Sequence, residues 1–161
     1  MNKPISPQQA LARLEALCAR SEQASGEVLE KMRRWGVTQA DAEKVLDSLV
    51  AGRYVDDSRF AAAFVRDKVR FARWGKRKIA QALAQKKIGR DIITAALDAV
   101  DQDEYTDSLR HILQAKIKSN PALTESYEGR TKIYRFGMQR GFEPELTGRL
   151  LREILSAIRK K

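Results

Sequence analysis

A helix–break–helix pattern of apolar residues occurs three times along the chain at a nearly constant spacing of roughly fifty residues. In the first copy the apolar positions are Val28, Met32, Val37, Ala42, Val45, Leu46 and Leu49. The equivalent positions of the second copy are Ile79, Leu83, Ile88, Ile93, Ala96, Leu97 and Val100. Those of the third copy are Ile133, Gly137, Phe142, Thr147, Leu150, Leu151 and Ile154. Because one small helical unit cannot bury its apolar face alone, such copies stack on one another. The pattern predicts an all-α chain with an elongated, curved binding surface and argues against a single catalytic pocket.

We expect about nine helices, arranged as three tandem three-helix units that resemble helix-turn-helix modules. The units are predicted at residues 1–53, 54–102 and 103–161. The helices are predicted near residues 7–20, 25–34, 38–51, 58–73, 76–87, 90–101, 104–118, 125–139 and 144–159.

Residues with cap preferences mark several of these helix ends. Ser6–Gln9 has the pattern of a capping box around a proline, and Ser25 and Thr38 are of the types that cap the next two helices. Asp56–Asp57 is predicted to cap the helix that follows. Gly52 is expected to supply the left-handed residue that ends the third helix.

Composition limits the class of protein. Only four prolines and nine glycines interrupt the 161 residues, and no apolar run approaches the roughly 20 residues that span a bilayer. The first residues carry no hydrophobic signal segment, so we expect a soluble, cytoplasmic protein without a membrane partner.

The residue types that carry most enzyme chemistry are scarce. One cysteine, Cys18, and one histidine, His111, cannot form a Cys/His zinc site, and Cys18 lies in the apolar stripe of its predicted helix. The GxSxG, HExxH and GxGxxG motifs are absent from the sequence. We therefore predict a protein that is not an enzyme, with no catalytic residue, metal or cofactor.

The chain is basic, and the charge is uneven. Its 31 lysines and arginines exceed its 21 aspartates and glutamates, which gives a formal net charge of +10. Residues 1–56 carry equal numbers of both signs, so the whole surplus lies in residues 57–161. This distribution predicts a surface that faces a polyanion or an acidic partner.

The predicted helix 58–73 carries an arginine face opposite a side that includes Phe60, Phe64 and Phe71. The face consists of Arg59, Arg66, Arg70 and Arg73. Like charges along one stripe repel one another, which favours a binding role over a merely solvated face, although both interpretations remain open. Lys68 projects into the apolar side, where it must extend toward solvent or pair with a carboxylate.

Further cations continue the basic surface. Lys76–Lys78 begins a helix, where cations oppose the helix dipole, so an anionic partner is expected there. Lys86, Lys87 and Arg90 lie at the next helix break. A weaker cluster consists of Arg130, Lys132, Arg135 and Arg140, and residues 159–161 form a basic tail. Such a surface predicts salt-sensitive binding with little sequence specificity.

Two tryptophans, Trp35 and Trp74, each precede a glycine at a helix break. Packing at a helix junction is the favoured interpretation for both, and stacking on nucleic-acid bases is the alternative.

Two stretches carry a resemblance to a known family. Residues 52–88 read GRYVDDSRFAAAFVRDKVRFARWGKRKIAQALAQKKI, and residues 132–142 read KIYRFGMQRGF. Both are similar to motifs of the bacterial regulatory protein RecX family, and the likeness extends over residues 8–158. The chain departs from the pattern at Gly137, where a large apolar residue is usual, and at Lys87, where glycine is common. Glycine within a helix costs about 1 kcal/mol relative to alanine, so Gly137 is expected to weaken the third unit.

The resemblance implies a function. Members of that family are all-α modulators of the RecA recombinase that lie in the groove of the RecA–DNA filament. They inhibit its ATPase, strand-exchange and coprotease activities, and so regulate DNA repair and the SOS response without chemistry of their own. By position, Arg66, Arg70, Arg73, Lys76, Arg77, Lys78, Lys86 and Lys87 would face the filament.

The expected partners are therefore the RecA filament and, weakly, single- and double-stranded DNA, bound by a monomer. The full set of candidate contacts is Arg59, Arg66, Arg70, Arg73, Lys76, Arg77, Lys78, Lys86, Lys87, Arg90, Arg130, Lys132, Arg135 and Arg140. The alternative is a stand-alone DNA-binding protein of the helix-turn-helix kind.

Overall fold

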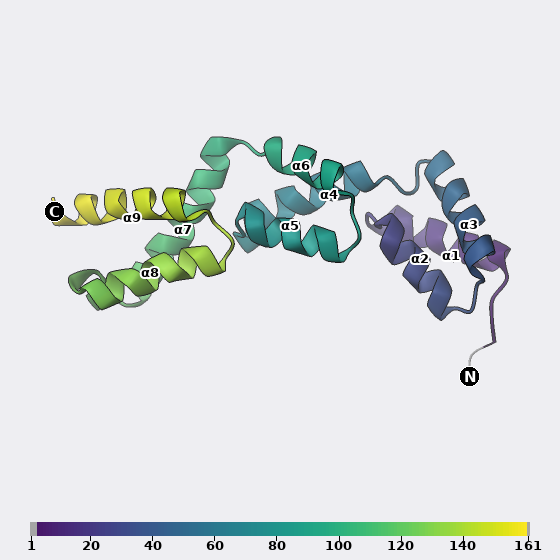
Figure 1. Ribbon diagram of the computed structural model, residues 1–161, viewed down its shortest axis with the longest axis horizontal. Helices are drawn as coiled ribbons and strands as arrows, with labels where there is room; N and C mark the ends of the chain where they lie inside the picture. The colour runs from purple at the N-terminus through teal and green to yellow at the C-terminus, as the bar shows by residue number, and fades with distance from the viewer. Residues whose placement is uncertain (1–2, 161) are drawn as a thin grey trace. The chain divides into compact units, whose positions relative to one another are not determined.

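The computed structural model describes residues 3–160, which form nine α-helices, one π-helix, one 3-10 helix and no strand (Figure 1). The predicted all-α class and the helix count are confirmed. The α-helices are α1 (Pro7–Arg20), α2 (Ser25–Arg34), α3 (Gln39–Ala51), α4 (Asp57–Asp67), α5 (Lys76–Gln85), α6 (Arg90–Asp98), α7 (Gln102–Ser119), α8 (Tyr127–Gln139) and α9 (Pro144–Arg159). The short elements are the π-helix η1 (Lys68–Ala72) and the 3-10 helix η2 (Pro121–Glu125). Lys161, the end of the predicted basic tail, lies outside the described residues.

The chain forms two compact units, and each is described by itself. Unit 1 comprises residues 1–64 and 83–96, and unit 2 comprises residues 65–82 and 97–161. Helices α4, α5 and α6 each have residues in both units. The division into repeats at 1–53, 54–102 and 103–161 stays a prediction.

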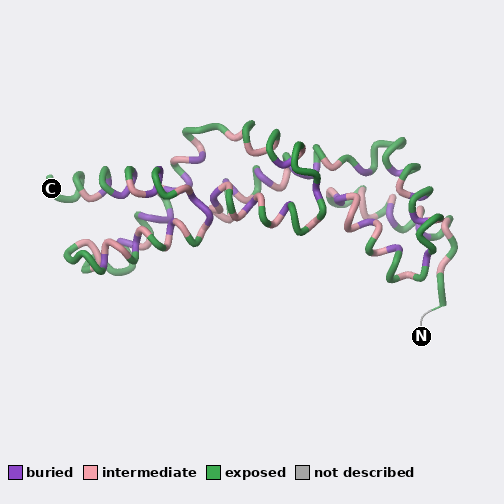
Figure 2. Tube along the Cα trace, in the orientation of Figure 1, coloured by how far each residue is buried: buried purple, intermediate pink, exposed green. Residues whose placement is uncertain are grey.

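The core of unit 1 is formed by the first helical triplet, in which α3 packs against both α1 and α2. Its buried residues are Ala10, Leu14, Val28, Met32, Val37, Ala42, Val45, Leu49 and Val55. Six of the seven apolar positions of the first repeat are in this cluster, and the seventh, Leu46, packs against it. Figure 2 shows buried residues at intervals along the helices, between exposed ones. The helical periodicity of the sequence therefore identified this core.

The core of unit 2 is formed by α7, α8 and α9, each of which packs against the other two. Every predicted apolar position of the third repeat is buried, Gly137 included. A Cβ atom at Gly137 would lie 2.7 Å from the Cγ2 of Thr147 and 3.3 Å from the Cδ2 of Leu113. A side chain at Gly137 would force Thr147 to shift, so glycine allows α8 to pack closely against its neighbours here. The expected weakening of the third unit stays a prediction.

The helix caps are partly as predicted. Ser6 and Gln9 form the capping box, Thr38 accepts a hydrogen bond from the Asp41 amide, and Asp56 accepts one from the Arg59 amide at 3.0 Å. Ser25 was expected to cap α2, but it is the first helical residue, and Ala24 precedes it without a side-chain cap.

Five described residues adopt the left-handed backbone conformation, and three of them are not glycine. Gly36, Lys87 and Gly141 occupy the same position of the three repeats, with φ of 82°, 63° and 97°. Lys87 therefore takes a conformation that the other two repeats give to glycine. Gly52 has a φ of −83°, so the left-handed residue predicted there is instead its neighbour Arg53, with φ 63°.

The predicted continuous helix 58–73 is interrupted. Helix α4 ends at Asp67, the π-helix η1 follows, and Arg73 ends it with a φ of 59°. A π-turn holds more residues than an α-turn, so side chains after Asp67 leave the 100° spacing on which the arginine face was predicted. Val69 is buried, whereas Phe71, predicted on the apolar side, is 77% exposed.

Candidate binding surface

The start of α5, which carries three predicted contact residues, docks against the turn between α8 and α9. The Gly75 amide donates to the Arg140 carbonyl at 2.7 Å, and the Arg77 amide donates to the Gly141 carbonyl at 3.1 Å. A Cβ atom at Gly75 would lie 2.2 Å from the carbonyl carbon of Gly141. Gly75 is thus required here for a direct backbone-to-backbone contact.

Tyr105 provides the hydrogen-bond acceptor for the Lys76 amide, which lies between the two amides described above. Its hydroxyl accepts a hydrogen bond from the Lys76 amide at 2.9 Å and donates one to the Glu143 carboxylate. Burial raises the pKa of the Tyr105 hydroxyl, and the hydrogen bond to Glu143 raises it further. The amides of Gly75, Lys76 and Arg77 are therefore satisfied within the protein, by two backbone carbonyls and the Tyr105 hydroxyl. The anionic partner expected at this helix start stays a prediction, and it would have to bind the side chains of the cations.

The cations of this segment remain on the surface. Arg77 and Lys78 line a hollow of about 340 Å³ together with Gln81, Met138, Gln139 and Gly141. The Lys78 ammonium lies 4.5 Å from the centroid of the Trp74 ring, and the Lys68 ammonium lies 4.7 Å from it. Lys68 also lies 3.8 Å from the Asp67 carboxylate, so it does pair with a carboxylate, one of the two predicted solutions.

The two tryptophans are half-buried at helix junctions. Trp35 packs against the core of unit 1, and the Arg13 guanidinium lies 5.3 Å from its ring centroid. Trp74 lies beside two lysines of unit 2. The half-buried positions of both rings agree with packing at a helix junction, the favoured interpretation from the sequence.

The arginines around η1 differ in their surroundings. Arg70 forms an ion pair with Glu104 of α7. Arg66 is exposed, and Arg73 is half-buried in its left-handed conformation. The hydroxyl of Ser108 in α7 donates to the Val69 carbonyl at 2.6 Å, which holds the π-helix against α7.

The weaker cluster in the last triplet is partly structural. Arg130 donates to the Thr124 carbonyl at 3.2 Å, and Arg140 donates to the Ala72 carbonyl at 3.2 Å. Lys132 and Arg135 are exposed on α8. The two arginines therefore hold backbone segments, while the other two cations face solvent.

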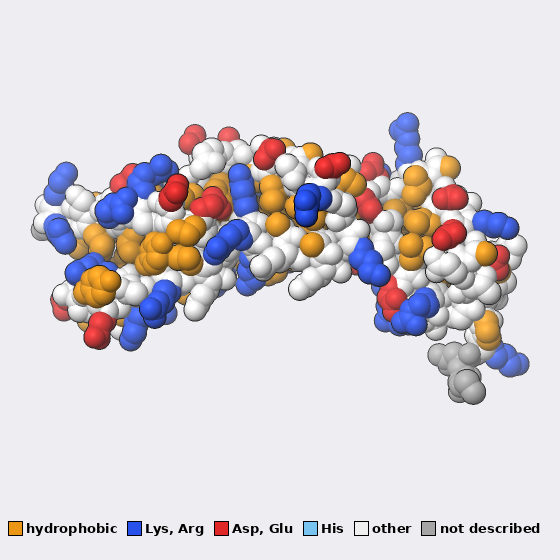
Figure 3. Space-filling view, viewed as in Figure 1, with side chains coloured by type: hydrophobic (Ala, Val, Ile, Leu, Met, Phe, Trp, Pro, Cys, Tyr) orange, Lys and Arg blue, Asp and Glu red, His pale blue; other side chains and the backbone are white. Residues whose placement is uncertain are grey.

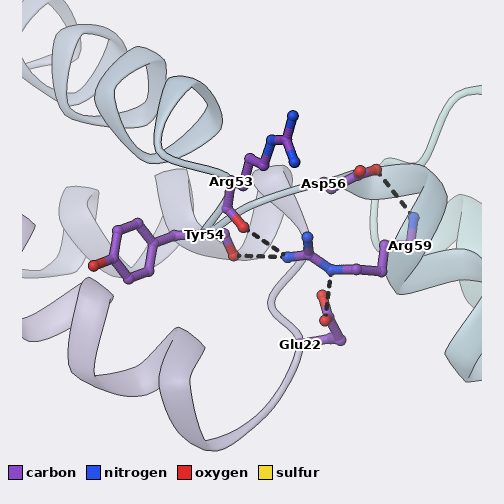
Figure 4. Close-up of polar contacts among 5 residues, drawn as sticks. All are labelled: Glu22, Arg53, Tyr54, Asp56 and Arg59. Atoms are coloured by element: carbon purple, nitrogen blue, oxygen red, sulfur yellow. Dashed lines mark hydrogen bonds and ion pairs between the residues drawn. The ribbon is translucent and has the colours of Figure 1, made fainter.

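Arg59 in unit 1 has a structural role (Figure 4). Its guanidinium donates to Glu22 at 2.7 Å and to the carbonyls of Arg53 and Tyr54 at 3.1 and 3.3 Å. The hydrogen bond to Glu22 raises the pKa of Arg59. These contacts tie the start of α4 to the loops after α1 and α3, so Arg59 is not free to bind a partner with its full charge.

Lys86 is also engaged within unit 1. Its ammonium lies 2.6 Å from the Glu27 carboxylate and 5.9 Å from the ring centroids of both Phe60 and Phe64. A Cβ atom on Gly26 would lie 2.9 Å from the Lys86 carbonyl oxygen, so α2 approaches this backbone closely. Lys87 and Arg90 next to it are exposed.

Asp57 completes the contacts of α2. Its carboxylate accepts hydrogen bonds from the amide and the hydroxyl of Ser25, at 2.8 and 2.5 Å. Asp57 was predicted to cap its own helix, but it caps α2, which lies 32 residues earlier in the sequence. Local sequence patterns do not report such long-range caps.

The predicted contact residues therefore fall into two groups, and Lys and Arg side chains are visible on the surface of both units in Figure 3. Six of them bind protein groups: Arg59, Arg70 and Lys86 pair with glutamates, and Arg77, Arg130 and Arg140 donate to backbone carbonyls, Arg77 to that of Met138 at 3.3 Å. The second group forms no ion pair in the described part of the chain and consists of Arg66, Arg73, Lys76, Lys78, Lys87, Arg90, Lys132 and Arg135. Of the second group, only Lys87 and Arg90 belong to unit 1.

Comparison with known proteins assigns this arrangement to a family. Models of the second and third three-helix domains of RecX match residues 56–97 and 103–151. The regulatory protein RecX of Prosthecochloris aestuarii is 32% identical over 136 residues, which cover 84% of this chain and 86% of that protein. The chain belongs to the RecX family.

Other RecX proteins extend the comparison. The regulatory protein RecX of Clostridium tetani is 31% identical over 84% of this chain, but the match covers only 62% of that longer protein. The crystal structure of RecX from Lactobacillus salivarius superposes with a TM-score of 0.82 at 16% identity and covers 91% of this chain and 95% of that one. The helical fold is therefore shared with RecX.

Within residues 3–160, no group of three or more His, Cys, Asp or Glu side chains could hold a metal ion. No helix in that range is long and apolar enough to cross a membrane. The residues that sequence reasoning missed are Tyr105, Glu143 and Phe71. The first two act through contacts 29 and 38 residues distant, for which the sequence carries no local signal.

Proposed function

We propose that this RecX family member is a non-catalytic negative modulator of the RecA recombinase. It binds the groove of the RecA–DNA filament and so lowers ATP hydrolysis, strand exchange and coprotease activity. The protein acts as a cytoplasmic monomer, and the DNA it touches is bound weakly and without sequence specificity.

The observation that supports this proposal most directly is the group of surface cations in unit 2 that no acidic side chain neutralises. Arg66, Arg77 and Lys78 represent it, since all three belong to one compact unit and two of them line one hollow. Filament DNA and its protein coat offer phosphates and carboxylates, and arginine and lysine bind both without reading a base sequence. Relatives with the same fold carry the name regulatory protein RecX, which agrees with a modulating role.

The decisive experiment adds the purified chain to RecA assembled on single-stranded DNA and follows ATP hydrolysis. We expect inhibition at stoichiometric amounts. The variant Arg66→Glu/Arg77→Glu/Lys78→Glu should require at least tenfold more protein, because each lost phosphate or carboxylate contact removes a favourable charge interaction. Raising the salt concentration should weaken the parent more than the variant.

A matched variant carries the same change of charge at engaged positions, as in Arg59→Glu/Arg70→Glu/Lys86→Glu. It is expected to lose folding stability, and at temperatures where it stays folded it should inhibit better than the first variant. Normal RecA hydrolysis in the presence of excess parent protein would refute the proposal. The alternative, a stand-alone helix-turn-helix-like DNA-binding protein, would instead protect one specific duplex sequence without RecA.

A further inference from the structure

Phe71 is one of two highly exposed aromatic residues of unit 2, and folding does not account for its position. It is 77% exposed, while Val69, two residues earlier in the same π-helix, is 2% exposed. On a regular α-helix Phe71 would lie on the apolar side, and the π-turn is what moves it to the surface. None of the ring contacts recorded among residues 3–160 involves its ring. Short π-helical turns occur frequently at functional sites, which makes the uncovered ring of Phe71 a candidate binding position.

Phe71 borders a hollow of about 420 Å³ that lies wholly within unit 2. The aromatic, imidazole and cationic side chains around it are Phe71, Arg73, His111, Lys116, Phe136 and Arg140, and Ser119 adds a hydroxyl. No aspartate or glutamate belongs to the lining. The volume is within the range of about 300–1,000 Å³ that is usual for small-molecule sites. The hollow therefore combines an aromatic face with a positive field.

Two of the cations in this hollow are held in place by the protein. The Lys116 ammonium and the Arg140 guanidinium each lie 5.1 Å from the centroid of the Phe136 ring. Arg140 is further held by its hydrogen bond to the Ala72 carbonyl. The Phe136 ring thus positions the cations, while the Phe71 ring stays available.

We propose that this hollow binds one unstacked base of a single-stranded nucleic acid. The base stacks on Phe71, and the adjoining phosphates contact Arg73, Lys116 and Arg140. Proteins that bind single strands combine aromatic platforms with cations in this way, because every base has a flat face and every nucleotide carries a phosphate. An acidic peptide would satisfy the cations but would leave the flat ring without a matching surface. The inference rests on the proposed function, because it names this hollow as the place where the DNA strand of the filament would bind.

The test compares two ligands of equal charge. Fluorescence anisotropy gives the Kd of the chain for a labelled thymidine oligonucleotide and for an abasic oligonucleotide of the same length, without RecA. We expect the parent to prefer the thymidine ligand by about tenfold, as one stacked base provides. The substitution Phe71→Ala should abolish this preference and leave the abasic Kd within about twofold. The substitution Phe71→Trp should keep the preference, and its added indole fluorescence should be quenched by the thymidine ligand alone.

Tyr127→Ala is the matched control, because Tyr127 is 78% exposed in the same unit and does not line the hollow. It should keep the preference for bases. Equal binding of both ligands by the parent would overturn the inference, and so would a Phe71→Ala variant that keeps the preference. If that variant kept the preference but lost RecA inhibition, Phe71 would contact a protein instead. A parent that prefers bases yet fails to inhibit RecA would reject only the proposed function.

Discussion

Two equivalent helix junctions in this protein are held together by different chemistry. In unit 1 the start of α2 packs against the turn between α5 and α6. In unit 2 the start of α5 packs against the turn between α8 and α9 in the same way. In unit 1, Gly26 approaches the Lys86 carbonyl, and the charged side chains of Glu27 and Asp57 hold the contact. In unit 2, Gly75 meets the backbone of Gly141 directly through backbone hydrogen bonds.

This difference explains where the free positive charge lies. The junction of unit 1 uses Lys86 in an ion pair, and the neighbouring Arg59 pairs with Glu22. The junction of unit 2 is held by backbone hydrogen bonds and by Arg77 and Arg140, which donate to the carbonyls of Met138 and Ala72. No carboxylate therefore neutralises Lys76, Arg77 or Lys78 there. The repeated fold supplies the same contact twice, and the choice of residues decides which copy is available for binding.

The strongest test of this comparison substitutes alanine for the glycine of each junction. Gly75→Ala should lower the free energy of unfolding by about 3 kcal/mol, because the new Cβ atom overlaps backbone atoms that cannot rotate away. Gly26→Ala should cost less, about 1–2 kcal/mol, because its Cβ atom would lie 2.9 Å from the Lys86 carbonyl oxygen, which must shift slightly, while alanine favours the helix. Urea unfolding followed by circular dichroism measures both values.

Gly148→Ala provides the control for helix propensity. Its Cβ atom would lie 3.4 Å from the nearest atom, an ordinary contact, so alanine within α9 should stabilise the protein by about 0.5–1 kcal/mol. Equal losses at positions 75 and 26 would show that the two junctions are not different in kind.

A substitution of Asp57 tests the contribution of charged side chains to the junction of unit 1. Asp57→Ala removes the acceptor of two hydrogen bonds from Ser25 and should destabilise the protein by about 2 kcal/mol. Asp56→Ala is the matched control, because the adjacent, exposed carboxylate accepts one hydrogen bond within its own helix and should cost about 1 kcal/mol. Thermal unfolding of both variants in the same buffer gives the difference. A larger loss at Asp56 would mean that Asp57 does not hold the junction.

Sequence patterns predicted the helices and cores of this protein because both depend on local periodicity. The apolar positions from Val28 to Ile154 recur with the spacing of a helix, and most of them are buried. The exceptions are half-buried: Leu46, Ala96, Leu97 and Val100. Ser6 and Thr38 were recognisable as caps for the same reason, since a cap and its helix are adjacent in the sequence.

The candidate site was only partly predictable, because contacts between segments distant in the sequence determine which of its cations pair with a carboxylate. Sequence alone could not separate Lys86, which pairs with Glu27 59 residues away, from the unpaired Lys78. Nor could it predict the π-turn that exposes Phe71, because one extra residue in a turn leaves no clear compositional mark. The close packing at Gly137 was not predictable for a related reason, since it depends on where the neighbouring helix lies.

The smallest expected effect concerns the turn of unit 1, where Lys87 adopts the left-handed conformation that Gly36 and Gly141 adopt in the other repeats. Lys87→Gly should raise the free energy of unfolding by about 1 kcal/mol, because glycine relieves the steric cost of a positive φ. Lys87→Ala removes the same charge but keeps a Cβ atom, so it should bring no gain. Urea unfolding of both variants separates backbone strain from charge. If both variants gained equally, relief of repulsion between cations would be the cause, and the strain assigned to this junction would be absent.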